Sequence, residues 1–356
     1  IEYAIENSPE IKEVSHGIKS YQSQLNQAKA ASFPQVNLLT YVAPTYRVSG
    51  DALTYNKNYD KWGPYYYSKL EVHQPLYTWG KIGNYKKAAE KGILVAKNET
   101  KQKENEVIYE VKKYYYSLLL ARKLKRVVEN IMEKLIDTIN KAEKLYQQGT
   151  GEIKKCELEE LKVYLAEAEK NYHEADKSVR LARLALMQKM GMGEEMDFDI
   201  KDKKLRPVKA ELDSVDTYIA MAFENRPEWK MVEEGIQARE ALIKVEKADY
   251  YPILFAGGEL RYNWTSVRQD QKNPWLYDEF NVFDGGVAIG ALFTLNPFDT
   301  KAKVQSREAE YLKLKEKKRF ARSGIILQVK KAYYCLLYTS DAADELDGVD
   351  LGGRRI

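Results

Sequence analysis

The sequence contains few of the residues that build disulfide, metal or cofactor sites. Of 356 residues only 2 are Cys and 3 are His (His16, His73 and His173), so neither a disulfide framework nor a metal cluster is indicated. The signature motifs of serine hydrolases, zinc peptidases, thiol oxidoreductases and P-loop nucleotidases are missing as well. We therefore expect no catalytic, cofactor-binding or metal site, and we expect that the protein is not an enzyme.

Long apolar runs are also missing, and proline and glycine are scarce. No run of about 18 apolar residues occurs, so the sequence predicts no transmembrane helix. With 10 Pro, 20 Gly and 31% charged residues, the composition is typical of long, water-facing helices. Basic residues are spread along these helices among acidic ones, which indicates solvated faces and no nucleic-acid partner. Tyrosine is abundant, with 27 Tyr against 9 Phe, and it suits surfaces between water and apolar material.

Both ends of the chain are irregular. It starts at Ile1 inside a helical pattern, with neither an initiator Met nor a signal peptide, so we expect a fragment or a processed form. Helical periodicity stops after Tyr334, and residues 335–356 resemble a translated sequencing adapter. We expect this segment to have no counterpart in the natural gene; the alternative is a natural acidic tail.

An internal repeat organises the remaining sequence. The segment Ala4–Glu10 (AIENSPE) matches Ala222–Glu228 (AFENRPE), an offset of 218 residues. The same offset relates Phe33-Pro34 to Tyr251-Pro252, and Val111–Lys113 to Val329–Lys331. A single offset that holds at separated places indicates duplication. We place the first repeat at residues 1–210 and the second, truncated one at 211–334.

Each repeat is predicted to run helix, strand, loop, strand, long helix. In the first repeat the opening helix reaches about Ser32, strands cover about 36–47 and 65–76, and a polar loop covers 49–64. In the second repeat the strands cover about 253–264 and 286–296. Between the strand pairs, residues 80–190 form a helical hairpin and residues 192–210 a charged connector. The fold class is therefore α+β.

The strands alternate between a polar and an apolar face. Such alternation over about ten residues is typical of strands with one face in water and the other in lipid. We expect five polar residues to face a water-filled lumen: Lys69, Glu71, His73, Glu259 and Arg261. We expect Leu70, Val72, Ile289 and Phe293 to face lipid.

The hairpin carries heptad ladders and a glycine-rich turn. Apolar residues step by four and three along both helices, which predicts an antiparallel coiled coil, although the ladder slips in phase near Leu124.

The segment Gly149-Thr150-Gly151 follows a helix, so it indicates a turn more than a phosphate loop. The turn leaves backbone groups free to meet a partner, and its candidate docking residues are Gly149, Thr150, Gly151, Glu152, Lys154 and Lys155. Glu152 has a second interpretation, capping of its own helix. Cys156 is either a packing residue or a thiol with a pKa lowered by its lysine neighbours.

Taken together, these motifs resemble the outer membrane efflux proteins, the TolC-like family. The resemblance covers about residues 1–334 and rests on four segments: the repeated AIENxPE start, Gln27–Leu38 (QAKAASFPQVNL), Gln74–Lys81 (QPLYTWGK) and the tip Leu145–Gly149 (LYQQG). It implies a homotrimer in which each chain gives four strands to one twelve-stranded outer-membrane β-barrel, in contact with outer membrane lipid. It also implies that the coiled coils form an α-helical barrel in the periplasm.

The resemblance further implies a function. The channel would be a passive conduit of a tripartite efflux or type I secretion system, with no cofactor, whose hairpin tips meet a periplasmic adaptor protein of an inner-membrane pump. Two departures from the family pattern bear on this: Glu152 and Lys155 occupy tip positions where the family has other residues, and a second hairpin would begin near position 364. Two alternatives stay open, a periplasmic adaptor (membrane fusion) protein with a coiled-coil hairpin and an enzyme with a helical insertion.

Overall fold

A computed structural model describes residues 1–50, 56–149, 153–193, 196–203, 205, 212–268, 275, 278 and 280–348, with side chains up to residue 339. The chain divides into two compact units. The first contains Ile1–Gly17, Ala96–Glu228 and Ile325–Ile356, and the second contains Ile18–Val95 and Trp229–Gly324. Each unit takes segments from both halves of the sequence.

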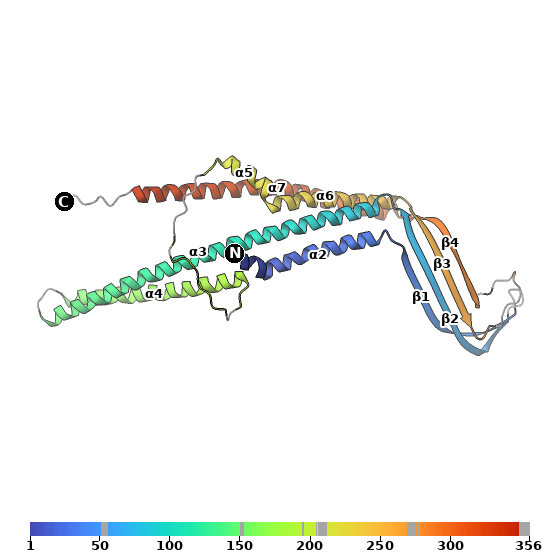
Figure 1. Ribbon diagram of the computed structural model, residues 1–356, viewed down its shortest axis with the longest axis horizontal. Coiled ribbons are helices and arrows are strands. Elements are labelled where there is room, and N and C mark those ends of the chain that lie inside the picture. The colour runs from blue at the N-terminus through green and yellow to red at the C-terminus, as the bar shows by residue number, and fades with distance from the viewer. Residues whose placement is uncertain are drawn as a thin grey trace. The chain divides into compact units, whose positions relative to one another are not determined.

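The first unit is helical (Figure 1). It holds α1 (Glu2–Asn7), the start of α2 (Pro9–Ala30), most of α3 (Lys81–Gln147), α4 (Lys155–Met190), α5 (Val215–Asn225) and the end of α7 (Pro297–Gly348). The first of these helices end at Asn7 and Ala30, so the single opening helix predicted to about Ser32 is wrong: Ser8 and Pro9 divide it. Within the described part of the chain, no helix has both the length and the apolar composition needed to cross a membrane.

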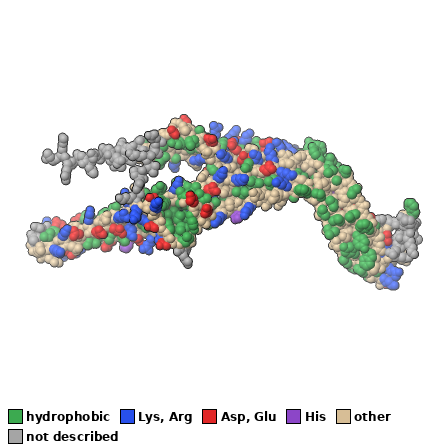
Figure 2. All heavy atoms as spheres, in the orientation of Figure 1, with side chains coloured by type: hydrophobic (Ala, Val, Ile, Leu, Met, Phe, Trp, Pro, Cys, Tyr) green, Lys and Arg blue, Asp and Glu red, His purple; other side chains and the backbone are tan. Residues whose placement is uncertain are grey.

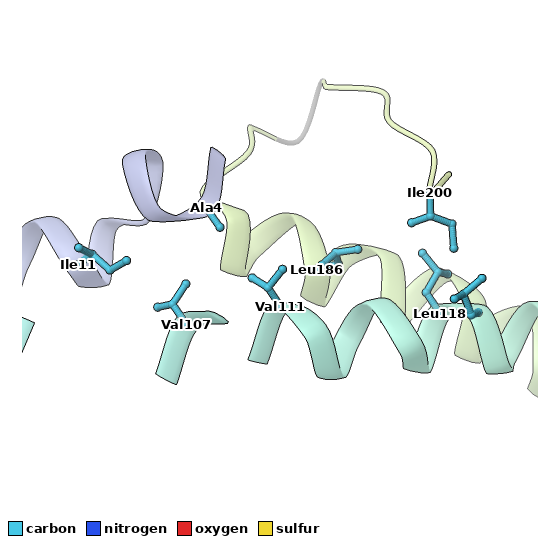
Figure 3. Packing of buried hydrophobic residues seen from close by; sticks show 8 residues of the cluster. Ala4, Ile11, Val107, Val111, Leu118, Leu186 and Ile200 are labelled. Carbon is cyan, nitrogen blue, oxygen red and sulfur yellow. The ribbon is translucent and has the colours of Figure 1, made fainter. Parts of the chain in front are cut away.

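The predicted heptad ladders pack α3 against α4 as an antiparallel pair. The main cluster contains Val107, Val111 and Leu118 of α3 and Leu186 of α4, all nearly inaccessible to solvent (Figure 3). A second cluster, near the hairpin turn, contains Ile139, Ala142 and Leu158. Between the two clusters, no residue of 122–138 or 169–185 is buried. This stretch begins at the predicted phase slip, where Leu124 is 52% exposed.

The end of α4 is fastened to the α1–α2 junction. Lys189 Nζ lies 2.6 Å from carboxylate oxygens of both Glu10 and Glu110, and these hydrogen bonds raise the pKa of Lys189. Gly191 ends α4 in the left-handed conformation with φ of 70°. A Cβ at this position would lie 2.6 Å from the carbonyl oxygen of Asn7, so only glycine fits.

The second unit combines helices with one sheet. Its strands are β1 (Gln35–Ser49), β2 (Asn56–Tyr77), β3 (Ile253–Thr265) and β4 (Val282–Leu292), arranged in the order β1-β2-β3-β4 with antiparallel neighbours. The helical part contains the end of α2, the start of α3, α6 (Pro227–Lys247), the 3-10 turn η1 (Ala248–Tyr250) and the start of α7. Ion pairs tie these helices together, among them Lys91–Glu234 at 2.7 Å.

The four strands differ from the predicted ones in two places. Residues 56–64 of the polar stretch are not a loop, because β2 starts at Asn56 and pairs with β1 through its polar residues. Pro44 and Pro64, which lack N–H donors, lie opposite each other in this ladder. β4 ends at Leu292, so Phe293 lies beyond the strand on which it was expected.

A sharp turn joins β2 to α3 at Trp79 and Gly80, which both have positive φ, 50° and 78°. Such a conformation is unusual for tryptophan, and tertiary contacts hold it. The Trp79 indole donates a hydrogen bond to the Pro252 carbonyl oxygen at 2.7 Å and stacks on Tyr251 with ring centroids 4.8 Å apart. The motif QPLYTWGK therefore marks the point where the sheet meets the helices.

Candidate functional site

The five predicted polar residues of the sheet share one face. Lys69 pairs with Arg261 and Glu71 with Glu259 across β2 and β3, and directly paired residues point to the same side. Lys69 Nζ bridges two carboxylates, Glu71 at 2.5 Å and Glu259 at 3.1 Å. His73 follows on the same face and packs edge-on against Phe255 at 5.8 Å.

The polar face has a member that the sequence reasoning missed. Asp284 of β4 receives both arms of the Arg261 guanidinium, with 3.0 Å from Nε to Oδ1 and 2.5 Å from Nη2 to Oδ2. Its pairing with Arg261 follows from the β3–β4 register. The sequence shows Asp284 as a carboxylate next to two glycines. It does not show the strand register that brings Asp284 opposite Arg261. The side chains from Lys69 to Asp284 form a polar band across three strands.

The opposite face is apolar and exposed. Leu70 pairs with Leu260, Val72 with Gly258, and Val287 and Ile289 of β4 lie on the same side. Val287 is 92% exposed and Ile289 81%, which is far more than a water-facing sheet normally presents. Figure 2 shows hydrophobic side chains over the strands. This face has the composition of a surface that lies against lipid.

The hairpin turn forms the second candidate site. Gly149 closes α3 in the left-handed conformation, with φ of 72°. Thr150, Gly151 and Glu152 lie outside the described residues. Helix α4 begins at Lys155, and the backbone N–H of Lys154 donates a hydrogen bond to Glu157 at 2.9 Å. Glu157 is thus a capping acid that the sequence reasoning missed.

Lys154 and Lys155 stand at an electrostatically unfavourable place. Both side chains are exposed at the N-terminal end of α4, where the helix dipole favours negative charge. Ile153, which precedes them, packs on the cluster of Ile139, Ala142 and Leu158. The arrangement presents two exposed cations at the start of α4.

The connector after α4 lies across both helices of the hairpin. Asp199 pairs with Arg122 of α3 at 2.6 Å, and Asp197 pairs with Arg183 of α4. Phe198, which lies between these two acids, packs against the main cluster of the hairpin. Ile200, which follows Asp199, is buried in that cluster. Charged composition alone had indicated only a linker. The structure shows residues 196–203 as a strap on the hairpin.

Among the described residues, no group of three or more His, Cys, Asp and Glu is arranged to hold a metal ion. Cys156 is exposed at the start of α4 and is a free thiol. The His173 ring packs edge-to-face against the Tyr172 ring, with centroids 5.6 Å apart, as neighbouring side chains on one helix surface.

Known proteins show which family this sequence matches. The sequence profile described as "Outer membrane efflux protein" matches residues 1–192, more than half of the chain. No curated protein matches the sequence.

Solved structures share the fold. The outer membrane protein VceC of Vibrio cholerae is 18% identical, with a TM-score of 0.72 over 96% of this chain and 78% of that chain. The outer-membrane channel OprN is 14% identical, with a TM-score of 0.74 over 98% and 74%. The CmeC outer membrane channel of Campylobacter jejuni is 13% identical, with a TM-score of 0.70 over 98% and 76%. At such identities the likeness shows the fold alone.

Proposed function

This chain belongs to the outer membrane efflux protein family, and from that premise we propose that it is one of three identical subunits of a passive conduit. The chain is an outer-membrane channel subunit with its helical part in the periplasm. In the proposal, the conduit leads from the periplasm to the exterior as part of a tripartite efflux or type I secretion system.

The two unlike faces of the sheet are the observation that carries the proposal. One face bears the charges of Lys69, Glu71, Glu259 and Arg261, and the other bears aliphatic side chains that on β4 are largely exposed. A charged residue is costly against lipid and solvated in a water-filled pore, so the polar face is assigned to the lumen. The paired residues of β4 on this face include small ones, Gly286 opposite Glu259 and Ala288 opposite Gly257, which leave room for water and cargo.

Barrel closure is inferred from the sheet's edges. β1 and β4 are the outer strands of the sheet that the described residues form. An edge with unpaired backbone groups is not tolerated in lipid, and four strands are too few to close a barrel. Three chains that pair β1 of one with β4 of the next would form a barrel of twelve strands.

The repeat is part of the same proposal. Ala4 and Ala222 are both buried at equivalent positions, and so are Val107 and Ile325. Pro9 and Pro227 each open a helix that leads to a strand pair. Equivalent burial at repeat-related positions supports an internal duplication, in which each half supplies one pair of strands.

The hairpin tip is the proposed adaptor-docking site. Its exposed lysines oppose the dipole of their own helix, which suggests that their benefit lies in contact with another molecule. A periplasmic adaptor with acidic side chains at its tip would complement them. Gly149, Lys154 and Lys155 are the described members of this site, whose partner in the full system would be an adaptor bound to an inner-membrane pump.

Charge reversal tests the docking proposal. Lys154→Glu with Lys155→Glu should reduce adaptor cross-linking and export by about tenfold, because rigid surface charges govern association with a charged partner. Lys123→Glu with Lys134→Glu, on exposed turns of α3, is the matched control and should leave both unchanged. Unaltered export in the tip variant at normal membrane levels would remove these lysines from the site.

A further inference from the structure

Two aromatic groups mark a band on the sheet. Near the helices, the Trp79 ring contacts both Tyr77 and Tyr251, with centroid distances of 4.9 and 4.8 Å. Toward the other end, Tyr66 contacts Tyr262 at 5.9 Å, and Trp264 pairs with Tyr66. On β2 the groups lie about 11 residues apart, which is roughly 37 Å along the strand and about 28 Å in height at a usual barrel tilt. That height matches the apolar band of a membrane barrel.

The first two strands continue beyond this band. β2 has 22 residues and β1 has 15, whereas about 9–11 residues are enough to cross a bilayer. Tyr46 and Trp62 pair with each other on the same face as Val42 and Tyr66. They lie about four residues past Tyr66, or roughly 10 Å higher at the same tilt, which is the depth of lipid head groups.

The projecting part of β1 and β2 is built around a bulge that gathers aromatic rings. The register shifts between Tyr46 and Arg47, so that residues 59–61 bulge from β2. Tyr46 contacts Tyr59 at 4.9 Å and Trp62 at 6.0 Å, and Lys57 Nζ lies 5.6 Å from the centre of the Tyr46 ring. The Trp62 indole donates a hydrogen bond to the Tyr59 carbonyl oxygen at 2.7 Å, which fixes the ring. Tyr59 is 60% and Trp62 59% exposed.

Three cations lie on or beside this bulge: Lys57 lies over the Tyr46 ring, Arg47 follows Tyr46 in the chain and Lys61 precedes Trp62. Arg47, Lys57 and Lys61 are exposed, with Asp60 as the acid of the bulge. Figure 2 shows a basic patch at the end of the sheet remote from the helices. Cations form strong, short hydrogen bonds with phosphate oxygens, and amphipathic rings suit the boundary between lipid and water, where they can stack on sugars. The combination is suited to a phosphorylated sugar that is anchored in lipid.

We propose that Arg47, Lys57 and Lys61, with the rings of Tyr46, Tyr59 and Trp62, bind the phosphorylated sugar head group of an outer-leaflet glycolipid. This inference rests on the proposed function, because it requires the sheet to span the outer membrane with its free end outside. The contact would anchor the channel in the outer leaflet and fix the height of the barrel.

The test is binding of lipopolysaccharide to the protein purified in detergent. Arg47→Gln/Lys57→Gln/Lys61→Gln should weaken binding by about tenfold or more, because the charge-assisted contacts to phosphate are lost. The control Lys112→Gln/Lys123→Gln/Lys134→Gln, which removes three exposed charges from α3, should bind like the parent. Enzymatically dephosphorylated lipopolysaccharide should bind the parent as weakly as the intact lipid binds the Arg47→Gln/Lys57→Gln/Lys61→Gln variant.

Two results would overturn the proposal. One is equal affinity of the parent and the Arg47→Gln/Lys57→Gln/Lys61→Gln variant for lipopolysaccharide, and the other is equal affinity of the parent for the phosphorylated and dephosphorylated forms. Trimer mass and channel conductance are measured on the same samples. A conducting trimer without phosphate-dependent binding would contradict the glycolipid site alone, whereas loss of the trimer in the parent would contradict the proposed function. If the triple variant fails to assemble, Lys61→Gln alone should still show a measurable loss.

Discussion

At the scale of single residues, Gly191 should be the least replaceable position at the end of α4. Gly191→Ala would place a Cβ against the Asn7 carbonyl oxygen in a left-handed conformation, and we expect a loss of about 1–3 kcal/mol in the free energy of unfolding. Gly193→Ala is the control, since a Cβ there meets no atom within 4 Å. Urea unfolding followed by helical circular dichroism measures both. Equal stability of the two variants would contradict this prediction, because it would mean that the α1–α2 junction moves to accommodate the added Cβ.

The Lys125–Asp176 pair should make the hairpin sensitive to acid. The hydrogen bond from Lys125 at 2.7 Å, together with nearby Arg180, holds the pKa of Asp176 below its ordinary value of 3.8. A lowered folded-state pKa gives a stabilisation that is present above about pH 4 and is lost as pH falls through the folded-state value. Asp176→Asn should therefore lower the melting temperature at pH 7. The difference from the parent should shrink as the pH falls below about 4 toward the folded-state pKa of Asp176. A difference that stays constant from pH 7 to 3 would exclude this pair as the cause.

At the scale of elements, the two faces of the sheet should tolerate charge unequally. Ile289→Arg puts a cation on the apolar face and should cost about 2–4 kcal/mol at mid-depth, which impairs assembly in the outer membrane. Glu259→Arg, one strand away on the polar face, should be inserted at nearly normal levels. Quantitative immunoblots of heat-modifiable trimer in outer-membrane fractions compare them. Equal insertion of both variants would refute the assignment of the faces.

Periodicity made much of the architecture predictable. Alternation of Lys69 and Glu71 with Leu70 and Val72 predicted which residues share a face. This works because successive side chains of any β-strand point to opposite faces of the sheet. Heptad spacing predicted the α3–α4 pairing, because apolar residues at that spacing form one seam. These local rules are strong where one side of an element is apolar.

Long-range contacts were not predictable in the same way. Residues 56–64 read as a loop because they are polar, yet they extend β2 by pairing with β1. The strap residue Ile200 is buried against α3 and α4, but a single apolar residue in a charged connector gives no periodic signal. Asp284 joins the polar face through register, which depends on the neighbouring strand and not on its own sequence.

At the scale of the whole molecule, every surface described points to an assembly larger than one chain. An apolar face with Ile289 81% exposed requires lipid, and the outer strands β1 and β4 require neighbours. The proposed trimer would satisfy both requirements at once, since three subunits would cover the strand edges and enclose the polar face. The lumen charges would then repeat three times around the pore.

The most direct test of this account is a single-particle reconstruction of the protein in lipid nanodiscs. We expect a threefold ring in which β1 of each subunit pairs with β4 of the next, with Lys69 and Glu259 lining a water-filled pore and Ile289 against lipid. A different number of subunits, or unpaired β1 and β4 edges at membrane depth, would contradict the central claim.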